Sequence, residues 1–423
     1  MAYSTQEGEI WLVRSDGTGA HKLASVGGKA FFLSWSPDGG AIRFTRDERL
    51  WEISSVGSNL HPLLPSWRAT SVQCCGRWTP DGRFFLFQAR GLSSQENELW
   101  ALDERRGFFR QPPADPVQLT TGPMYWQSPI PGKDGKKIFA MGWTPRGELS
   151  RFDSKTKQFQ PLLGGISADS VSFSKDGRYV AYVSFPEGVL WKANRDGSNP
   201  VQLSDPPMHA MLPSWSPDGT QILFHDASSD WPKSYIVSSQ GGIPRRLLPE
   251  GNGTQWDPNW SPDGQKIVWA SGVIGDTTKS YLSIFDLASH RVNRVPGSIG
   301  MFSPRWSPDG RYLAALTFAS TCMRVFDIET QRWSGLPPKC ATDFPAWSKD
   351  GQFIYYLHIS GDDRGVFRIR VKGGEAERVV DMKDLHLTGW PYGYWLGLDP
   401  TDAPLILRDV GSDDIYALTV DEK

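Results

Sequence analysis

A five-residue box, Trp-Ser-Pro-Asp-Gly, recurs along the chain and constrains its fold more than any other feature. Clear copies stand at 35–39, 78–82 (with Thr for Ser), 215–219, 260–264 and 306–310, and altered copies at 173–177 and 347–351. A further altered copy ends at Asp134-Gly135. The final glycines, at 39, 82, 135, 177, 219, 264, 310 and 351, are separated by 43, 53, 42, 42, 45, 46 and 41 residues. A period in the low forties built from short strands predicts a β-propeller.

One repeat shows the predicted unit. Residues 211–215, 221–225 and 234–238 alternate as short strands, and a fourth strand begins at 246. In the box turn, Pro presets φ, Asp can bond the backbone ahead of it, and Gly accepts a positive φ. Second strands are expected at 41–45, 84–88, 137–141, 179–183, 266–270, 312–316 and 353–357, and third strands at 50–54, 98–103, 149–153, 189–193, 282–286, 323–327 and 366–370. We therefore expect an all-β propeller of four-stranded antiparallel blades, with about eight to nine repeats and almost no helix.

The predicted organisation is one repeat array over residues 1–423. Residues 31–380 hold eight full repeats, 1–24 a partial blade without a box, and 390–423 a partial C-terminal blade with a decayed box. Three arrangements are compatible with these ragged ends: one ring of about nine blades, an array that begins partway through a longer one, or a closed propeller with leftover blades. Propellers typically have ~4–8 blades. The two partial ends favour an array cut from a longer relative.

The composition limits the classes of partner. The net charge is −2 and the isoelectric point about 6.4, so no overall basic field invites nucleic acid. No signal peptide or apolar window long enough to cross a membrane is visible. The chain as given would be cytoplasmic on that basis, and the sequence leaves its compartment open. Cys74, Cys75, Cys322 and Cys340 lack metal-binding spacing and are expected as free or partly buried thiols, although Cys322 could pair with Cys340 if adjacent strands align.

The box and the strands that follow it resemble the repeats of TolB-type propellers, which are similar to WD repeats, over essentially the whole chain. Segments 50–67, 74–88, 302–316 and 403–418 more narrowly resemble the C-terminal part of bacterial winged-helix transcriptional regulators. Relatives that carry a membrane segment place these repeats in the periplasm. The resemblance implies a sensory or protein-interaction module. It implies no DNA binding by this chain, in which no winged helix is visible.

The sequence offers little support for catalysis. The nearest match to a Gly-x-Ser-x-Gly nucleophile elbow, at 165–169, lacks the last Gly, so a prolyl-oligopeptidase-like hydrolase is not expected. The seven histidines are scattered and His-Glu-x-x-His is absent, so no metal or cofactor is predicted. The box aspartates recur at one position of the turn, which favours a structural role. The box tryptophans are expected to pack between sheets.

A site is expected at the mouth of the central channel, formed by residues that precede each box tryptophan. These positions vary between repeats while the box stays constant, and they are rich in residue types found at binding hot spots. The alternative is that their aromatic rings simply plug the channel or pack between blades. The candidates are Arg77, Tyr125, Trp126, His209, Met211, Trp256, Asp257, Phe302, Phe344 and Tyr392.

The predicted function is that of a non-catalytic module which recognises a protein or peptide at the channel face, with no direct nucleic-acid binding and no membrane insertion. One alternative is a propeller enzyme, a hydrolase or lyase, with an axial site, or the propeller part of a prolyl-oligopeptidase-like peptidase without its hydrolase domain. Another is a structural spacer. A metal or clustered acids in the channel would favour an enzyme. Loss of ligand binding without loss of folding on removal of Trp126 and Trp256 would favour the binding module.

Overall fold

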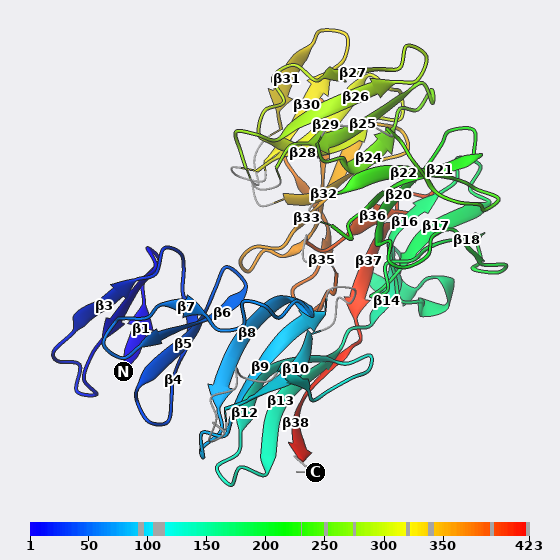
Figure 1. Cartoon of the computed structure of the whole chain (residues 1–423). Coiled ribbons are helices and arrows are strands. Elements are labelled where there is room, and N and C mark those ends of the chain that lie inside the picture. Colours follow the sequence, from blue (N-terminus) through cyan, green and yellow to red (C-terminus); the bar gives the residue numbers. More distant parts are fainter. Residues whose placement is uncertain are drawn as a thin grey trace. The chain divides into compact units, whose positions relative to one another are not determined.

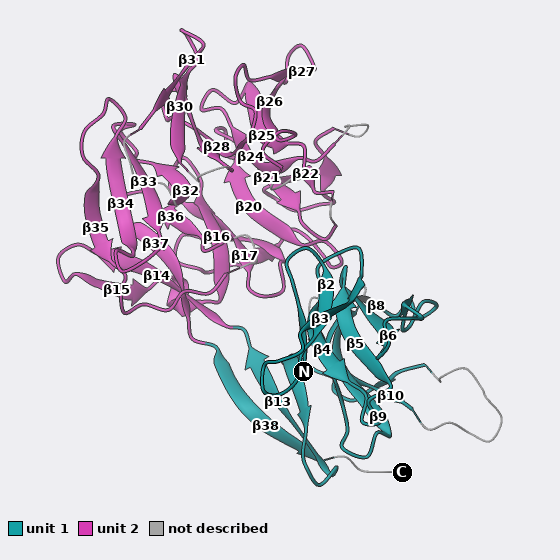
Figure 2. Ribbon diagram, turned by 90° about the vertical axis from the view of Figure 1, so that its left-hand side faces the viewer, with its two compact units in different colours: residues 1–145, 411–423 teal, residues 146–410 magenta. Residues whose placement is uncertain are grey.

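The computed structural model describes residues 1–91, 97–104, 115–229, 231–248, 253–273, 276–318, 322–336, 342–389 and 393–419. The chain forms two compact units (Figures 1 and 2). Unit 1 comprises Met1–Pro145 and Gly411–Lys423, and unit 2 comprises Arg146–Val410. Strands dominate both units, and the described residues hold one short 3-10 turn, η1 (Leu163–Gly165). This arrangement confirms the all-β class expected from the repeats.

Unit 2 contains six antiparallel sheets of four strands each. Five of them follow the chain without interruption. In order they are β16 (Ala168–Phe173), β17 (Tyr179–Ser184), β18 (Leu190–Asn194) and β19 (Val201–Gln202); β20 (Ala210–Trp215), β21 (Gln221–Asp226), β22 (Lys233–Ser238) and β23 (Arg245–Arg246); β24 (Trp256–Trp260), β25 (Lys266–Ser271), β26 (Tyr281–Asp286) and β27 (Arg291–Arg294); β28 (Met301–Trp306), β29 (Tyr312–Thr317), β30 (Met323–Asp327) and β31 (Arg332–Gly335); β32 (Thr342–Trp347), β33 (Phe353–His358), β34 (Gly365–Arg370) and β35 (Glu377–Asp381).

The sixth sheet joins the two ends of unit 2. Its order is β15 (Gln158–Pro161), β14 (Gly147–Asp153), β37 (Pro404–Asp409) and β36 (Leu396–Leu398). The inner strands contact one another in the order β16, β20, β24, β28, β32 and β36, and β36 contacts β16. Unit 2 is therefore a closed six-bladed propeller, and pairing strands from both ends of its chain removes exposed sheet edges at the closure.

Unit 1 contains four sheets, two of them with three strands. They are β1 (Ala2–Ser4), β2 (Glu9–Leu12) and β3 (His21–Ser25); β4 (Phe31–Trp35), β5 (Ala41–Arg46), β6 (Arg49–Ser54) and β7 (His61–Pro62); β8 (Thr70–Trp78), β9 (Phe84–Gly91), β10 (Asn97–Asp103) and β11 (Val117–Gln118); and β12 (Tyr125–Pro131), β13 (Lys137–Thr144) and β38 (Ser412–Thr419). Neighbouring sheets meet through contacts of β4 with β1 and β8, and of β8 with β12.

The strands expected for the third repeat do not form one sheet. The predicted second strand lies in β13, which pairs with β38 in unit 1, whereas the predicted third strand lies in β14, which pairs with β37 in unit 2. The third repeat and the C-terminal partial repeat have thus exchanged their third strands. Both pairings keep one register, with Thr144 opposite Ser412 and Gly147 opposite Asp409.

The box forms the same turn in each clear copy. In the blade formed by β20–β23, the Ser216 hydroxyl donates to the Asp218 carboxylate at 2.6 Å, and that carboxylate accepts the Thr220 backbone N–H at 3.0 Å. The indole N–H of Trp215 donates to the backbone carbonyl of Ser172 in the preceding blade, and Trp347 does the same toward Arg305. The box therefore closes a turn and ties neighbouring inner strands together, a structural role like the one predicted.

A second repeated feature lies three residues before the box aromatic. The residue there has a positive φ, as in Leu212 (49°), Asp257 (50°), Ser303 (52°) and Phe344 (48°), and the strand register shifts around it. Such a bulge redirects the side chains beside it. In unit 2, the bulged residues of four neighbouring blades line a cavity.

The cysteines differ from the expectation of free or partly buried thiols. Cys74 and Cys75 form a disulfide between adjacent residues in β8 of unit 1, and Cys322 is also disulfide-bonded. Cys340 lies outside the described residues. The direct neighbours Cys74 and Cys75 sit at the bulge of their strand, which brings their sulfur atoms together.

Candidate functional site

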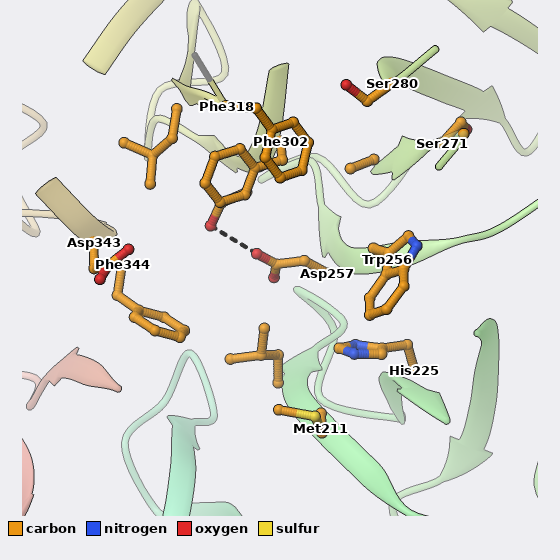
Figure 3. Close-up of a pocket in the computed structure, with 15 residues that line it drawn as sticks. Met211, His225, Trp256, Asp257, Ser271, Ser280, Phe302, Phe318, Asp343 and Phe344 are labelled. Atoms are coloured by element: carbon orange, nitrogen blue, oxygen red, sulfur yellow. Dashed lines mark hydrogen bonds between the residues drawn. The ribbon is translucent and has the colours of Figure 1, made fainter. Parts of the chain in front are cut away.

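Unit 2 encloses a cavity of about 320 Å³ bounded by four neighbouring blades (Figure 3). Its walls come from the inner strands β20, β24, β28 and β32 and from the second strands behind them. The volume suits a small organic group or a side chain of a larger partner. The lining residues are Met211, Leu212, His225, Trp256, Asp257, Ala270, Ser271, Gly272, Ser280, Phe302, Ser303, Leu316, Phe318, Asp343 and Phe344.

Large apolar side chains form most of the cavity wall. The rings of Phe302 and Phe318 stack with their centroids 4.1 Å apart. Trp256 lies on one side of the cavity and Phe344 on the opposite side (Figure 3). Both Trp256 and Phe302 are only partly buried and pack against the cluster formed by Val268, Leu282 and neighbouring core residues. The wall therefore presents aromatic faces, and an apolar ligand that packs against them would displace water from the cavity.

Asp257 carries a charge at the edge of the cavity, and that charge is paired. The Arg305 guanidinium donates to one carboxylate oxygen at 2.7 Å, and the Ser303 hydroxyl donates to the other at 2.8 Å. Asp257 lies on β24, whereas Ser303 and Arg305 lie on β28. The group therefore links two blades and satisfies the carboxylate before any ligand enters.

His225 brings an imidazole to the same cavity from β21. His225 is 2% exposed, and its Nδ1 has no hydrogen-bond partner among the described residues. Burial lowers the pKa of His225 to about 4, an effect that the nearby carboxylates of Asp257 and Asp226 only partly oppose. The imidazole is thus neutral at neutral pH, and its ring lies 5.9 Å from that of Trp256.

Asp343 supplies a second carboxylate, on β32. Burial raises its pKa. Among the described residues, no hydrogen bond or ion pair joins this carboxylate to another side chain. Figure 3 places Asp343 across the cavity from His225 and Trp256. Asp343 and Asp257 therefore differ sharply, because only Asp257 is neutralised within the fold.

The channel continues past the cavity into a more polar space of about 430 Å³. All six inner strands of unit 2 line it, and its far end is formed by residues of and around the box turns, such as Lys175, Lys349 and Asp402. Asp399, in the turn after β36, accepts a hydrogen bond from Arg151 at 2.6 Å. This ion pair joins β14 to the turn that follows β36.

The ten predicted site residues are divided between the two units. Five of them line the cavity of unit 2, namely Met211, Trp256, Asp257, Phe302 and Phe344. Arg77, Tyr125 and Trp126 belong to unit 1, on β8 and β12. Tyr392 lies outside the described residues.

Two of the predicted residues pack inside their own unit. Trp126 is buried in the core of unit 1, where its ring meets that of Tyr416 at 5.3 Å. His209 is buried against Gly188, and burial lowers its pKa to about 4. Tyr125, by contrast, is only partly buried and lies 5.3 Å from the ring of Trp143. Trp126 therefore has a packing role in unit 1, which is the alternative to ligand binding that the sequence analysis gave for these aromatic residues.

The list of ten omitted two residues that carry chemistry in the cavity, His225 and Asp343. His225 pairs across the sheet with Met211, at a position occupied in other blades by Ala270, Leu316 or Leu357. A histidine where the repeat has an apolar residue is a departure that the sequence displays. Asp343 similarly stands where neighbouring blades have Met211, Trp256 and Phe302, four residues before the box aromatic.

Neither a metal cluster nor a membrane-spanning helix occurs in the part of the chain that the structure describes. No group of three or more His, Cys, Asp or Glu side chains is placed to hold a metal ion there. No described helix is long and apolar enough to cross a membrane.

Comparison with known proteins gives partial matches. No family model matches the chain. An uncharacterised protein of Agrobacterium fabrum is 26% identical over 250 residues, covering 56% of this chain and 82% of that protein. A TolB homologue of Chlorobium chlorochromatii is 28% identical over 172 residues, covering 39% of this chain and 38% of the homologue. A solved TolB-like structure from Agrobacterium tumefaciens has a TM-score of 0.49 at 20% identity and covers 63% of this chain and 98% of that one.

The similarities in sequence agree with the box repeats and the closed ring in indicating a TolB-like propeller fold. They do not support the narrower resemblance to winged-helix transcriptional regulators. The six closed blades of unit 2 and the similarity to a TolB homologue in sequence together identify the fold as a TolB-like β-propeller.

Proposed function

We propose that unit 2 is a non-catalytic binding module that recognises a segment of a protein or peptide in its channel cavity. One observation carries this proposal: four adjacent blades present large apolar side chains around a cavity of about 320 Å³ that contains few polar groups. Specific recognition sites commonly combine aromatic anchors with a small number of placed polar groups. Met211, Trp256 and Phe302 are the anchors that we expect to touch the ligand.

The hydrogen bonds of the cavity favour binding over hydrolysis. Ser303 donates to Asp257, and the hydroxyls of Ser271 and Ser283 bond to each other at 2.8 Å. Among the described residues, none of these serines is hydrogen-bonded to His225. A serine nucleophile requires a base within reach of its hydroxyl. These serines instead bond to Asp257 of the neighbouring blade (Ser303) or to each other within one blade (Ser271 and Ser283).

Selection from a random peptide library on the immobilised full chain tests the proposal. We expect enriched peptides to lose most of their affinity for the Trp256→Ala and Phe302→Ala variants and to keep it for Trp231→Ala. Trp231 is a matched control because it lies in unit 2, is 60% exposed and does not line the cavity. A wild-type selection without peptides that depend on Trp256 or Phe302 would overturn the proposal.

The same peptides separate binding from catalysis. After prolonged incubation with the chain, mass spectrometry is expected to recover them intact. Cleavage that is lost in His225→Asn would show that the cavity is an active site and that the non-catalytic part of the proposal is wrong.

A further inference from the structure

Asp343 is the one carboxylate lining the cavity that the described fold leaves without a partner. Asp257 is paired with Arg305 and Ser303, and the guanidinium of Arg305 is occupied by that contact. Asp343 has no such contact, and burial is the influence that raises its pKa. Removing a carboxylate from water costs free energy unless a cation or hydrogen-bond donor compensates it.

The position of Asp343 in the repeat is one whose side chains line the cavity in several blades. In three neighbouring blades the same position, four residues before the box aromatic, holds Met211, Trp256 or Phe302, and all three line the cavity. A β-bulge follows directly in each strand. Asp343 thus places a carboxylate where these three blades have apolar residues that line the cavity. In the β16 blade the same position holds Asp169, which is not among the residues that line the cavity.

The wall opposite Asp343 is aromatic and suits the apolar part of a cationic ligand. Trp256 and the stacked pair Phe302 and Phe318 present aromatic faces, which attract both apolar groups and cations. His225 is uncharged at neutral pH, because burial lowers its pKa to about 4. The described residues that line the cavity include no lysine or arginine, and the nearby Arg305 is neutralised by Asp257.

We propose that the cavity binds a primary ammonium group attached to an apolar body, with Asp343 as the anionic partner of the ammonium. This inference rests on the proposed function, of which it names the ligand chemistry. A peptide offers such a group either at its N-terminus or on a lysine side chain. A charge-assisted contact of this kind is expected to raise affinity by roughly 10- to 100-fold.

Three probes of nearly equal shape test the charge requirement. Phenethylamine, 2-phenylethanol and 3-phenylpropionate are titrated against the full chain at pH 7, with binding read by calorimetry and by the indole signals in nuclear magnetic resonance spectra. We expect the amine to bind at least about 10-fold more tightly than the alcohol, and the propionate to bind most weakly. In Asp343→Asn the preference for the amine should disappear while the alcohol binds as before.

Asp362→Asn is the matched control, because Asp362 is exposed on the same unit and is not part of the cavity. It is expected to keep the preference for the amine. Circular dichroism and the thermal midpoint check that Asp343→Asn is folded. Equal affinity of wild-type protein for amine and alcohol would overturn the inference but leave the proposed apolar recognition intact, and absence of binding by all three probes would also overturn it.

Two blocked peptides distinguish the sources of the ammonium. Each selected peptide is compared in an N-acetylated form and in a form with lysine replaced by norleucine. Loss of affinity in one form identifies the N-terminus or the lysine as the group bound by Asp343. A doubly blocked peptide that binds as tightly as the parent would overturn the inference, whereas a library without cavity-dependent peptides would refute the proposed function itself.

Discussion

The guanidinium of Arg305 on β28 lies 2.7 Å from the carboxylate of Asp257 on the neighbouring strand β24, so an ion pair joins two blades at the edge of the cavity. Both side chains are largely buried, with 18% and 12% of their surfaces exposed. Asp257 has a positive φ of 50°, and the bulge at this residue aims its carboxylate toward the next blade. The pair therefore depends on the backbone irregularity as well as on the two charges.

Replacing Arg305 by Met is expected to destabilise unit 2 by about 2–4 kcal/mol, because it leaves the Asp257 carboxylate buried with Ser303 as its one remaining partner among the described residues. The Asp257→Asn, Arg305→Met double variant should recover part of this loss. Hydrogen–deuterium exchange of peptides from β24 and β28 measures the change. Arg178→Met is the control, since the Arg178–Asp176 pair is exposed and screened by solvent, so its loss should change stability little. Equal effects of Arg305→Met and Arg178→Met would contradict the role given to the buried pair.

Trp126 and Trp256 are expected to respond differently to substitution although the sequence places both just before a box. Trp126→Ala should cost about 3–5 kcal/mol in unit 1, because the ring is buried against Leu99, Ile138 and Tyr416. It should leave peptide affinity unchanged. Trp256→Ala should instead weaken peptide binding and destabilise unit 2 less, because its ring is only partly buried. Exchange rates of each unit and peptide affinities measure the two effects, and loss of binding in Trp126→Ala would contradict this assignment.

The sequence was sufficient to predict the local unit of this fold. The turn at Ser216 and Asp218 forms as expected because its hydrogen bonds lie within five residues of one another. The partner of each strand is less predictable. The segments 137–141 and 414–418 alternate apolar and polar residues in a similar way, so this pattern allows either to pair with several strands. β38 pairs with β13 because the closing strands of unit 2 take β14 and β37. These closing strands are far apart in the sequence, as the 260 residues between Glu148 and Arg408 show.

The sequence predicted which position of the repeat faces the cavity, but not which repeats belong to the same ring. The residues before each box form one class in the sequence, and five of the ten candidates chosen from that class line the cavity. Arg77 and Trp126 belong to the same class but to unit 1, because ring closure rather than local pattern decides which blades share a channel. His225 reaches the cavity from a second strand, where its register opposite Met211 could be inferred only with the bulge in place.

The pH dependence of stability provides a test of the buried imidazole. The pKa of His225 is lowered from 6.5 to about 4 in the folded chain, so the unfolded chain binds the proton more readily. Stability should therefore fall as the pH drops from about 6.5 to 4, by up to roughly 3 kcal/mol. His225→Asn should flatten this part of the curve, measured by urea unfolding, whereas the exposed control His290→Asn should not. His209, whose pKa is also lowered, leaves a residual slope in the variant.

Asp169 should show the opposite dependence. Its side chain is 2% exposed on β16, and burial raises its pKa from 3.8 to about 6 although Ser170 donates a hydrogen bond to it. The folded chain therefore binds the proton more readily, and the stabilisation is present below pH 4 and is lost as the pH rises through 6. Asp169→Asn is expected to stabilise unit 2 by roughly 1–3 kcal/mol at pH 8 and to lose this advantage below pH 4.

The matched comparison for Asp169 is Asp218→Asn in a box turn, where the Ser216 hydroxyl lowers the pKa of the carboxyl. Because Asp218 is stabilised as the carboxylate, its replacement should destabilise unit 2 by about 1 kcal/mol at pH 8 and have less effect in acid. Urea unfolding of the two variants and the wild type between pH 3.5 and 8 therefore yields differences of opposite sign, converging at low pH. A destabilised Asp169→Asn variant at pH 8 would show that the buried carboxylate has a stabilising partner, and would contradict the view that its charge is merely tolerated.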